Sequence, residues 1–296
     1  MKIHFKKGID KCALCSNKLV HWRKKNAFGN IYNIDKCKHC GFGQVNPMPK
    51  KSSILNFYRN SFSNLSKLKT SSEAIEEEKK FPNAIIDAER IFANLKNFSE
   101  CKKMKTLLDV GCGYGFFSRE ASLKGFDVTA IELDSNSRMI AENIIKKDVI
   151  NIDFESISNN LRYEVILMSQ VLEHVTSPVK WIAKCNKLQK IDDFLIIAVP
   201  NFESIFVRIL KEKDPMCIPP EHLNYFTFNA LKILLNENGY SIIYHENISR
   251  INLRKIKERF GIIGFLVGFL AIGVLNLANK FSSGMFINIY AQKKII

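Results

Sequence analysis

Leu107-Leu108-Asp109-Val110-Gly111-Cys112-Gly113-Tyr114-Gly115 is the stretch of this sequence that decides the fold. Its apolar start predicts a buried strand at Thr106–Val110, and the residues from Phe116 to Lys124 predict a helix. Glycines at alternate positions let the backbone turn sharply and lie close against a ligand. The stretch therefore predicts a strand, a glycine-rich turn and a helix, the unit that opens an α/β domain.

Short apolar runs alternate with helical patterns on the C-terminal side of this stretch, which is typical of a parallel sheet. The predicted strands are Thr106–Val110, Val128–Glu132, Val149–Ile152, Val165–Ser169, Leu195–Val199, Ser241–His245 and Phe286–Ala291. We expect a Rossmann-like α/β domain over residues 101–296, with a seven-stranded, mostly parallel sheet and helices on both faces. Residues 61–100 predict a linker followed by a helix, whose apolar face carries Ile85, Ala88, Ile91, Phe92 and Leu95.

The spacing of the glycines indicates which class of ligand the turn binds. A dinucleotide-binding loop has the pattern G-x-G-x-x-G, which places a pyrophosphate at the helix N-terminus. Here the third glycine, Gly115, comes one residue early and position 116 is Phe. This spacing favours a ligand without pyrophosphate.

Asp109, Gly111, Gly113 and Gly115 resemble motif I of the class I methyltransferases, D/E-x-G-x-G-x-G, which holds S-adenosylmethionine. Glu132 ends the second strand, where its carboxylate is spaced to accept hydrogen bonds from both ribose hydroxyls. The resemblance implies that Asp153 meets the adenine amino group; the alternative is that Asp153 caps a helix. The full implied cofactor set is Asp109, Gly111, Gly113, Gly115, Glu132, Leu133, Asp153, Phe154, Ser169 and Gln170.

A second block, Ser169-Gln170-Val171-Leu172-Glu173-His174-Val175, resembles that of ubiquinone-biosynthesis O-methyltransferases and of sugar methyltransferases. An alcohol becomes a good nucleophile only when a base removes its proton, and histidine suits this near neutral pH. The resemblance implies that His174 is the general base and that Glu173 is its orienting partner or a second polar contact. His222, in the similar block Pro219–Phe226, is a second catalytic candidate. For both histidines the alternative is a structural role in bracing a loop.

Two close cysteine pairs mark residues 1–60 as a separate zinc-binding module. Twenty-one residues separate the pair Cys12 and Cys15 from the pair Cys37 and Cys40. Four thiolates at this spacing can close a tetrahedral Zn²⁺ site, and so short a segment needs a metal for stability. We expect a zinc-ribbon-like module with a structural Zn²⁺ and no open metal position; an iron site or degenerate pairs are the alternatives. The module resembles the leader of bacterial glycan and sugar methyltransferases.

Charge and hydropathy bear on partners and location. The chain carries a formal charge of +15, of which +11 lies in residues 1–60. This surface could face nucleic acid, anionic lipid or a phosphorylated substrate, or be merely solvated. An N-terminus without a secretory signal and reduced cysteines predict a cytoplasmic protein. The apolar insert at 260–279 could be a hairpin or helix touching the inner face of the membrane, or a buried helix.

Together these patterns predict an S-adenosylmethionine-dependent methyltransferase acting on a small-molecule or glycan acceptor, a sugar that could be lipid-linked. The methyl group would go to a sugar hydroxyl or to a sugar carbon. One alternative is a ribosomal-RNA methyltransferase that grips RNA through the basic module, although the module lacks an evident stacking motif. Another is a non-catalytic cofactor-binding scaffold, against which the intact Asp109, Glu132 and His174 argue.

Overall fold

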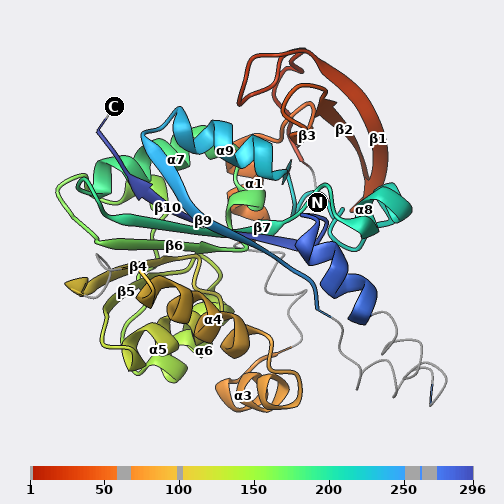
Figure 1. The fold of residues 1–296 in the computed structure, drawn as a ribbon. Coiled ribbons are helices and arrows are strands. Elements are labelled where there is room, and N and C mark those ends of the chain that lie inside the picture. The colour runs from red at the N-terminus through yellow and green to blue at the C-terminus, as the bar shows by residue number, and fades with distance from the viewer. Residues whose placement is uncertain (1–2, 59–67, 99–102, 251–260, 262–271, 296) are drawn as a thin grey trace.

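A computed structural model describes residues 3–58, 68–98, 103–250, 261 and 272–295, arranged around two sheets (Figure 1). The larger sheet has six strands in the order β5-β4-β6-β7-β10-β9. Its strands are β4 (Thr106–Val110), β5 (Asp127–Ile131), β6 (Val165–Ser169), β7 (Phe194–Pro200), β9 (Tyr240–Ile248) and β10 (Phe286–Lys293). Neighbours among β4 to β7 are parallel, and β10 lies antiparallel between β7 and β9. The predicted mostly parallel α/β fold is confirmed.

The predicted strand Val149–Ile152 is wrong, so the sheet of the described residues has six strands rather than seven. Only Ile150 pairs with β5, as an isolated bridge opposite Ile131. Its amide donates to Ala130 O, and its carbonyl accepts from Glu132 N. The chain then leaves the sheet at once, because Asp153 begins the short 3₁₀ helix η3 (Phe154–Ser156).

Helices cover both faces of this sheet, as Figure 1 shows. The helices of the larger domain are α4 (Ala84–Lys96), α5 (Phe116–Leu123), α6 (Ser135–Ile145), α7 (Pro178–Leu188) and α9 (Phe228–Asn236). Alternate residues of a strand point to opposite faces. Accordingly Leu107 packs in the cluster that holds α4 and α5, whereas Leu108 packs in the cluster that holds α7 and α9.

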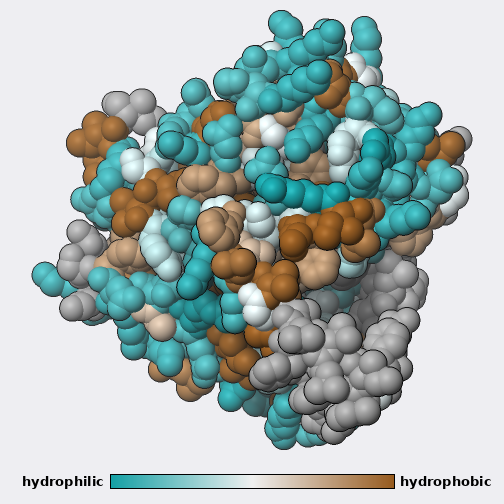
Figure 2. Space-filling view, turned by 45° about the vertical axis from the view of Figure 1, so that its right-hand side comes forward, coloured by the Kyte–Doolittle hydropathy of each residue, from teal (hydrophilic) through white to brown (hydrophobic). Residues whose placement is uncertain are grey.

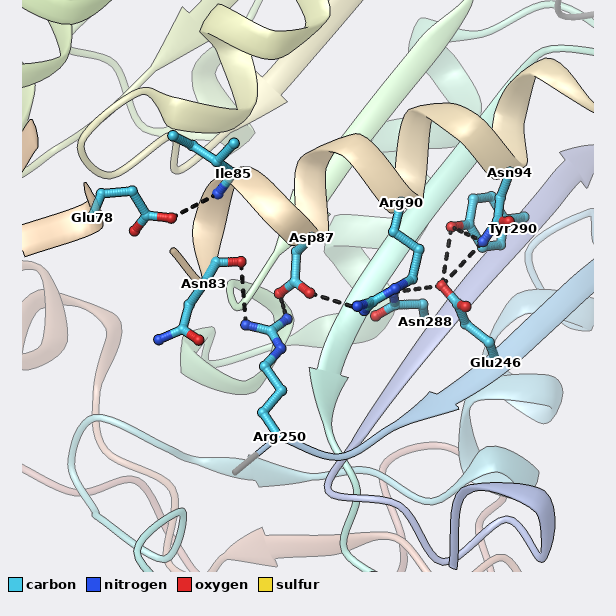
Figure 3. Close-up of polar contacts among 10 residues, drawn as sticks. All are labelled: Glu78, Asn83, Ile85, Asp87, Arg90, Asn94, Glu246, Arg250, Asn288 and Tyr290. Atoms are coloured by element: carbon cyan, nitrogen blue, oxygen red, sulfur yellow. Dashed lines mark hydrogen bonds and ion pairs between the residues drawn. The ribbon is translucent and has the colours of Figure 1, made fainter. Parts of the chain in front are cut away.

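The predicted N-terminal helix is α4, and its expected apolar face is buried except for half-buried Ile85. Polar contacts also fix α4 to the sheet (Figure 3). Asn94 donates to Glu246 of β9 at 3.2 Å and to the Tyr290 hydroxyl of β10 at 3.1 Å, and Arg250 pairs with Asp87. Ahead of α4, helix α3 (Ser71–Lys80) starts inside the predicted linker and has a capping box at its N-terminus.

The cysteine module (residues 3–58) is built on a second sheet that it does not complete alone. Its strands β1 (Leu19–Ala27), β2 (Asn30–Cys37) and β3 (Gly43–Val45) pair with β8 (Asn224–Tyr225), in the order β1-β2-β3-β8. Helix α1 (Lys51–Phe57) follows the sheet. Phe42 of the module packs against Phe226, with ring centroids 5.2 Å apart. The module is therefore joined to the larger domain by a shared sheet and a shared core.

Most of the apolar insert 260–279 lies outside the described residues. Residues 272–280 are helical, and Val274, Leu277 and Phe281 are exposed. Figure 2 shows hydrophobic surface bordering the region drawn in grey. Within the described parts of the chain, the model contains no helix whose length and hydropathy would suit a bilayer crossing.

Candidate cofactor and acceptor cavity

The glycine-rich turn has the backbone conformation that only glycine adopts readily. Gly111, Gly113 and Gly115 have φ angles of 67°, 55° and 83°. A Cβ at Gly111 would lie 2.9 Å from Val171, and one at Gly115 would lie 2.8 Å from Ile145. A Cβ at Gly113 would meet open space. The turn thus needs glycine for packing at two positions, and at the third it offers bare backbone to a ligand.

A cavity of about 400 Å³ opens at the carboxyl ends of β4, β5 and β6. Every predicted cofactor residue except Gly115 lines it. Gly115 instead stands at the N-cap of α5. The sequence-predicted residues are therefore gathered at one sheet edge, where open α/β sheets bind their ligands.

Glu132 ties the turn to the next loop. One carboxylate oxygen accepts from Gly113 N at 3.0 Å and the other from Asp134 N at 2.8 Å. Burial raises the pKa of Glu132. Carboxylate oxygens have further lone pairs, so Glu132 can hold the loops and still accept hydrogen bonds from a diol.

Asp109 lies beneath the turn and is buried. Its carboxylate accepts from the Ser118 hydroxyl of α5 at 2.6 Å. Burial raises the pKa of Asp109 to about 7, although the Ser118 hydrogen bond opposes this. Asp109 thus links β4 to α5 and still lines the cavity.

Asp153 caps a helix, which is one of the two roles that the sequence left open, and it also lines the cavity. Its side chain accepts from Glu155 N of η3 at 3.3 Å. Lys51 of α1 forms ion pairs with Asp153 at 2.6 Å and with Glu155 at 3.0 Å. The cysteine module therefore reaches the edge of the cofactor side of the cavity.

His174 lines the cavity from the 3₁₀ helix η4 (Leu172–His174). Its Nδ1 lies 2.8 Å from Glu221 O and 2.7 Å from the Tyr58 hydroxyl. A carbonyl oxygen can only accept, so the first contact places the proton on Nδ1 and leaves the lone pair on Nε2. Burial, with His222 beside it, lowers the pKa of His174 to about 3, so the ring is neutral at pH 7.

Glu173 and His222 lie next to His174 but do not line the cavity. Glu173 Oε1 is 3.9 Å from His174 Nε2, which is longer than a hydrogen bond. The Glu173 carboxylate is buried without a hydrogen-bond partner among the described residues, and burial raises its pKa to about 8. His222 Nδ1 contacts Met216 O at 2.7 Å, as in a braced loop, and burial lowers its pKa to about 4. The three side chains are close enough to share a metal ion.

Sequence reasoning did not assign a site role to the residues that α1 brings to the cavity. Lys51, Ile54, Leu55 and Tyr58 line it from the side opposite the glycine turn's strand. They are spaced three or four apart along one helical face, which is a weak signal because any amphipathic helix has it. Their position at the cavity depends on a contact between residues that are 116 positions apart in the sequence, Tyr58 and His174.

The four predicted metal-ligating cysteines come together. Cys12 and Cys40 have sulfurs 3.6 Å apart, and Cys15 lies 3.5 Å from both Cys37 and Cys40. Sulfurs held at about 2.3 Å from one Zn²⁺ are separated by about 3.8 Å, whereas a disulfide bond measures about 2 Å. The cluster thus fits a tetrahedral metal better than disulfides. His39 is exposed beside it.

Comparisons with known proteins identify relatives. A family profile described as "Methyltransferase domain" matches residues 84–245. The ubiquinone biosynthesis O-methyltransferase of Rickettsia bellii is 31% identical over 100 residues, which cover 32% of this chain and 42% of that protein. Its counterpart in Rickettsia typhi is 30% identical over 219 residues, 71% of this chain and 82% of that protein. The chain thus spans less than half of the first relative and most of the second.

Solved structures share the fold. The crystal structure of magnesium protoporphyrin IX methyltransferase from Synechocystis PCC 6803 with bound SAH has 12% sequence identity to this chain. The match covers 83% of this chain and 100% of that one, with a TM-score of 0.55. The Rossmann-like arrangement of the larger domain therefore matches that of a known methyltransferase.

Proposed function

This chain belongs to the methyltransferase domain family and is an S-adenosylmethionine-dependent enzyme, and we propose that it methylates a hydroxyl group of a small-molecule or glycan acceptor. The observation that carries the proposal is the position of His174. Its ring lines the same cavity as the glycine turn and Glu132, and it touches Tyr58 from the opposite wall.

The cofactor is assigned to the glycine-turn side of the cavity. Glu132 would accept hydrogen bonds from the ribose, and the bare backbone at Gly113 would lie against the ligand. Asp153 would meet the adenine, while its other oxygen stays paired with Lys51. When bound, S-adenosylmethionine supplies an electrophilic methyl group on its sulfonium.

His174 would remove the proton from the acceptor hydroxyl through Nε2. The Glu221 carbonyl holds the ring in the tautomer that this step needs, and Tyr58 fixes its orientation. Taking the proton creates an imidazolium ion in a buried setting, which is costly without a nearby negative charge. Glu173, 3.9 Å away, would lower that cost without a direct hydrogen bond, but only in its ionised form, which its raised pKa of about 8 makes the minor form at pH 7.

Zinc is proposed as a structural ion of the cysteine module. Cys12, Cys15, Cys37 and Cys40 would hold it, leaving no open position for chemistry. The ion's contribution to catalysis would be indirect, because the module carries α1, and α1 carries Lys51 and Tyr58 to the cavity. We also propose the domain boundaries: a zinc-binding module at 1–60, a linker with a helix at 61–100 and the methyltransferase domain at 101–296.

The acceptor class follows from the walls of the cavity. Ile54 and Leu55 of α1 and Trp181 of α7 give it apolar surface, which favours a compact organic acceptor over an RNA helix. A lipid-linked sugar would agree with the exposed Leu277 and Phe281, and with a cytoplasmic enzyme that touches the inner face of a membrane.

The first test is transfer of labelled methyl groups into cell extract separated into lipid, polysaccharide, nucleotide-sugar and RNA fractions. Label in a glycan, nucleotide-sugar or lipid fraction supports the proposal. Label confined to RNA contradicts it, and no transfer to any fraction favours a scaffold.

The second test is His174→Ala, measured on the acceptor found in this way. Loss of the base should reduce kcat by ~10²-fold or more, while the Kd for S-adenosylmethionine changes little. His21→Ala is the matched control, since His21 is an exposed histidine of β1 that lies outside the cavity. Unchanged turnover in His174→Ala would remove His174 from the role of base.

A further inference from the structure

Helix α8 (Ile205–Leu210) of the larger domain lies beside β1 of the cysteine module (Figure 1), and the 3₁₀ helix η5 (Lys211–Lys213) contacts β1. A second cleft lies between these elements. Its volume is about 200 Å³. It is lined by Trp22, Arg23, Lys36, Phe202, Glu203, Val207, Arg208 and Lys211. None of these eight residues lines the cofactor cavity.

The cleft concentrates positive charge that the protein does not neutralise. Of its four cationic side chains, Arg23 pairs with Glu212 at 3.2 Å. Lys36, Arg208 and Lys211 have no ion pair within the described ranges, and Glu203 is the one acidic residue in the lining. Cations that converge on a concave surface raise the local concentration of anions.

The floor of the cleft is rigid and aromatic. Trp22 and Phe202 pack edge to face, with ring centroids 4.8 Å apart, and Lys36 Nζ lies 5.2 Å from the Phe202 centroid. Phe202 in turn packs so closely on the backbone of β3 that a Cβ at Gly43 would lie 2.5 Å from it. The cationic groups therefore surround a preformed floor, so binding needs little reorganisation.

The cleft lies near His222 and the proposed base His174. A narrow cavity shares Trp22, Phe202, Val207 and Lys211 with it and is lined at its other end by His222. The His222 ring lies 4.8 Å from the His174 ring. A ligand in the cleft would thus lie on the far side of the loop that braces the proposed base.

We propose that this cleft binds the phosphate or diphosphate group of a small anionic ligand. Arg208 would supply a forked donor, and Lys36 and Lys211 would supply point charges, the groups that bind phosphate in proteins. The small concave shape favours a compact diphosphate over an extended nucleic-acid backbone, and Glu203 weakens the binding of any anion there. The proposal uses no residue of the methyl-transfer site, so it can fail independently of the proposed function.

Calorimetric titration of the full-length protein with inorganic pyrophosphate at low salt tests the site. The double variant Lys36→Glu/Lys211→Glu should weaken binding by at least ~10-fold, because two charge-assisted contacts become repulsive. Lys24→Glu is the matched control: Lys24 is an exposed lysine of β1 outside the cleft. It should change the affinity by less than ~2-fold, as expected for a screened surface charge. Unchanged zinc content and unchanged S-adenosylmethionine affinity in both variants verify that the cysteine module and the larger domain, respectively, remain folded.

Two further titrations distinguish the source of the diphosphate. Tighter binding of UDP-glucose than of pyrophosphate supports a nucleotide-linked ligand, and tighter binding of farnesyl diphosphate supports a lipid-linked one. Equal affinities support recognition of the diphosphate alone. The proposal is overturned if pyrophosphate does not bind or if the double variant binds it normally. It is also overturned if a short RNA binds more tightly and Lys24→Glu weakens that binding as much as the double variant does.

Discussion

The two walls of the cofactor cavity are assembled in different ways. The cofactor wall comes from the ends of β4, β5 and β6, which are neighbours in the sheet and in one stretch of sequence. The opposite wall comes from α1, which belongs to the cysteine module. The contact between Tyr58 and His174 joins the two walls across 116 residues.

Because the two walls come from different parts of the chain, different interactions stabilise them. Buried strands such as β4 and β6 support the cofactor wall through the main core. The α1 wall depends on a small module whose apolar residues pack partly among themselves and partly on the larger domain, and whose cysteine cluster ties its strands together. Damage to the module should therefore reduce turnover far more than cofactor affinity.

The largest expected effect comes from Cys37→Ser, which removes one sulfur from the cluster. Structural Zn²⁺ contributes about 10–16 kcal/mol to the folding of small zinc modules, so the variant should lose both metal and module structure. We expect kcat to fall by ~10³-fold or more, because the whole wall that α1 gives to the cavity is lost and not only the contact of Tyr58 with His174. Metal analysis and steady-state kinetics measure the two losses.

His39→Ala is the control for this variant, because His39 is an exposed neighbour of the cluster. It should keep the metal and full turnover. The comparison fails if Cys37→Ser loses cofactor affinity as severely as it loses turnover, since the two walls would then fold as one unit.

The next effect concerns the cofactor wall alone. Glu132→Gln replaces a carboxylate that accepts from Gly113 N and Asp134 N. Hydrogen bonds to a charged group contribute about 1.5–3 kcal/mol each, so the Kd for S-adenosylmethionine should rise by ~10- to 100-fold. Calorimetry measures this, and zinc content should not change. Glu142→Gln, on exposed α6 surface outside the cavity, should leave the Kd unaltered. A normal Kd in Glu132→Gln would exclude Glu132 from cofactor binding.

The sequence predicted the cofactor wall well because its signals are local. Thr106–Val110 and Val165–Ser169 are strands with the predicted bounds, since buried apolar runs and glycine turns depend on few distant contacts. The segment Val149–Ile152 is not a strand. It lies at the edge of the sheet, where a single bridge between Ile150 and Ile131 pairs it with β5. Periodicity does not reveal how many hydrogen bonds a short edge segment makes.

The opposite wall could not be predicted in the same way. The spacing of the two cysteine pairs was enough to predict that the four sulfurs lie together, because metal-binding cysteines recur at such spacings. By contrast, β8 completes the module's sheet with residues 224 and 225, and Tyr58 meets His174, through contacts that no local pattern encodes. Glu173 was expected to orient His174; it lies 3.9 Å from Nε2, beyond hydrogen-bond distance, and its role stays a prediction.

The smallest expected effect tests the contact that joins the walls. Tyr58→Phe removes the hydroxyl that lies 2.7 Å from His174 Nδ1 and keeps the ring that packs on Phe57. Nδ1 keeps its bond to the Glu221 carbonyl, so the tautomer survives and only the orientation of the ring loosens. One neutral hydrogen bond is worth about 0.5–1.5 kcal/mol, so kcat should fall by ~3- to 10-fold with little change in cofactor Kd. Tyr244→Phe makes the same chemical change at an exposed tyrosine of β9 outside the cavity and should leave kcat unaltered. If Tyr58→Phe instead raised the cofactor Kd and spared kcat, α1 would serve to close the cofactor site, and the division of labour between the two walls would be wrong.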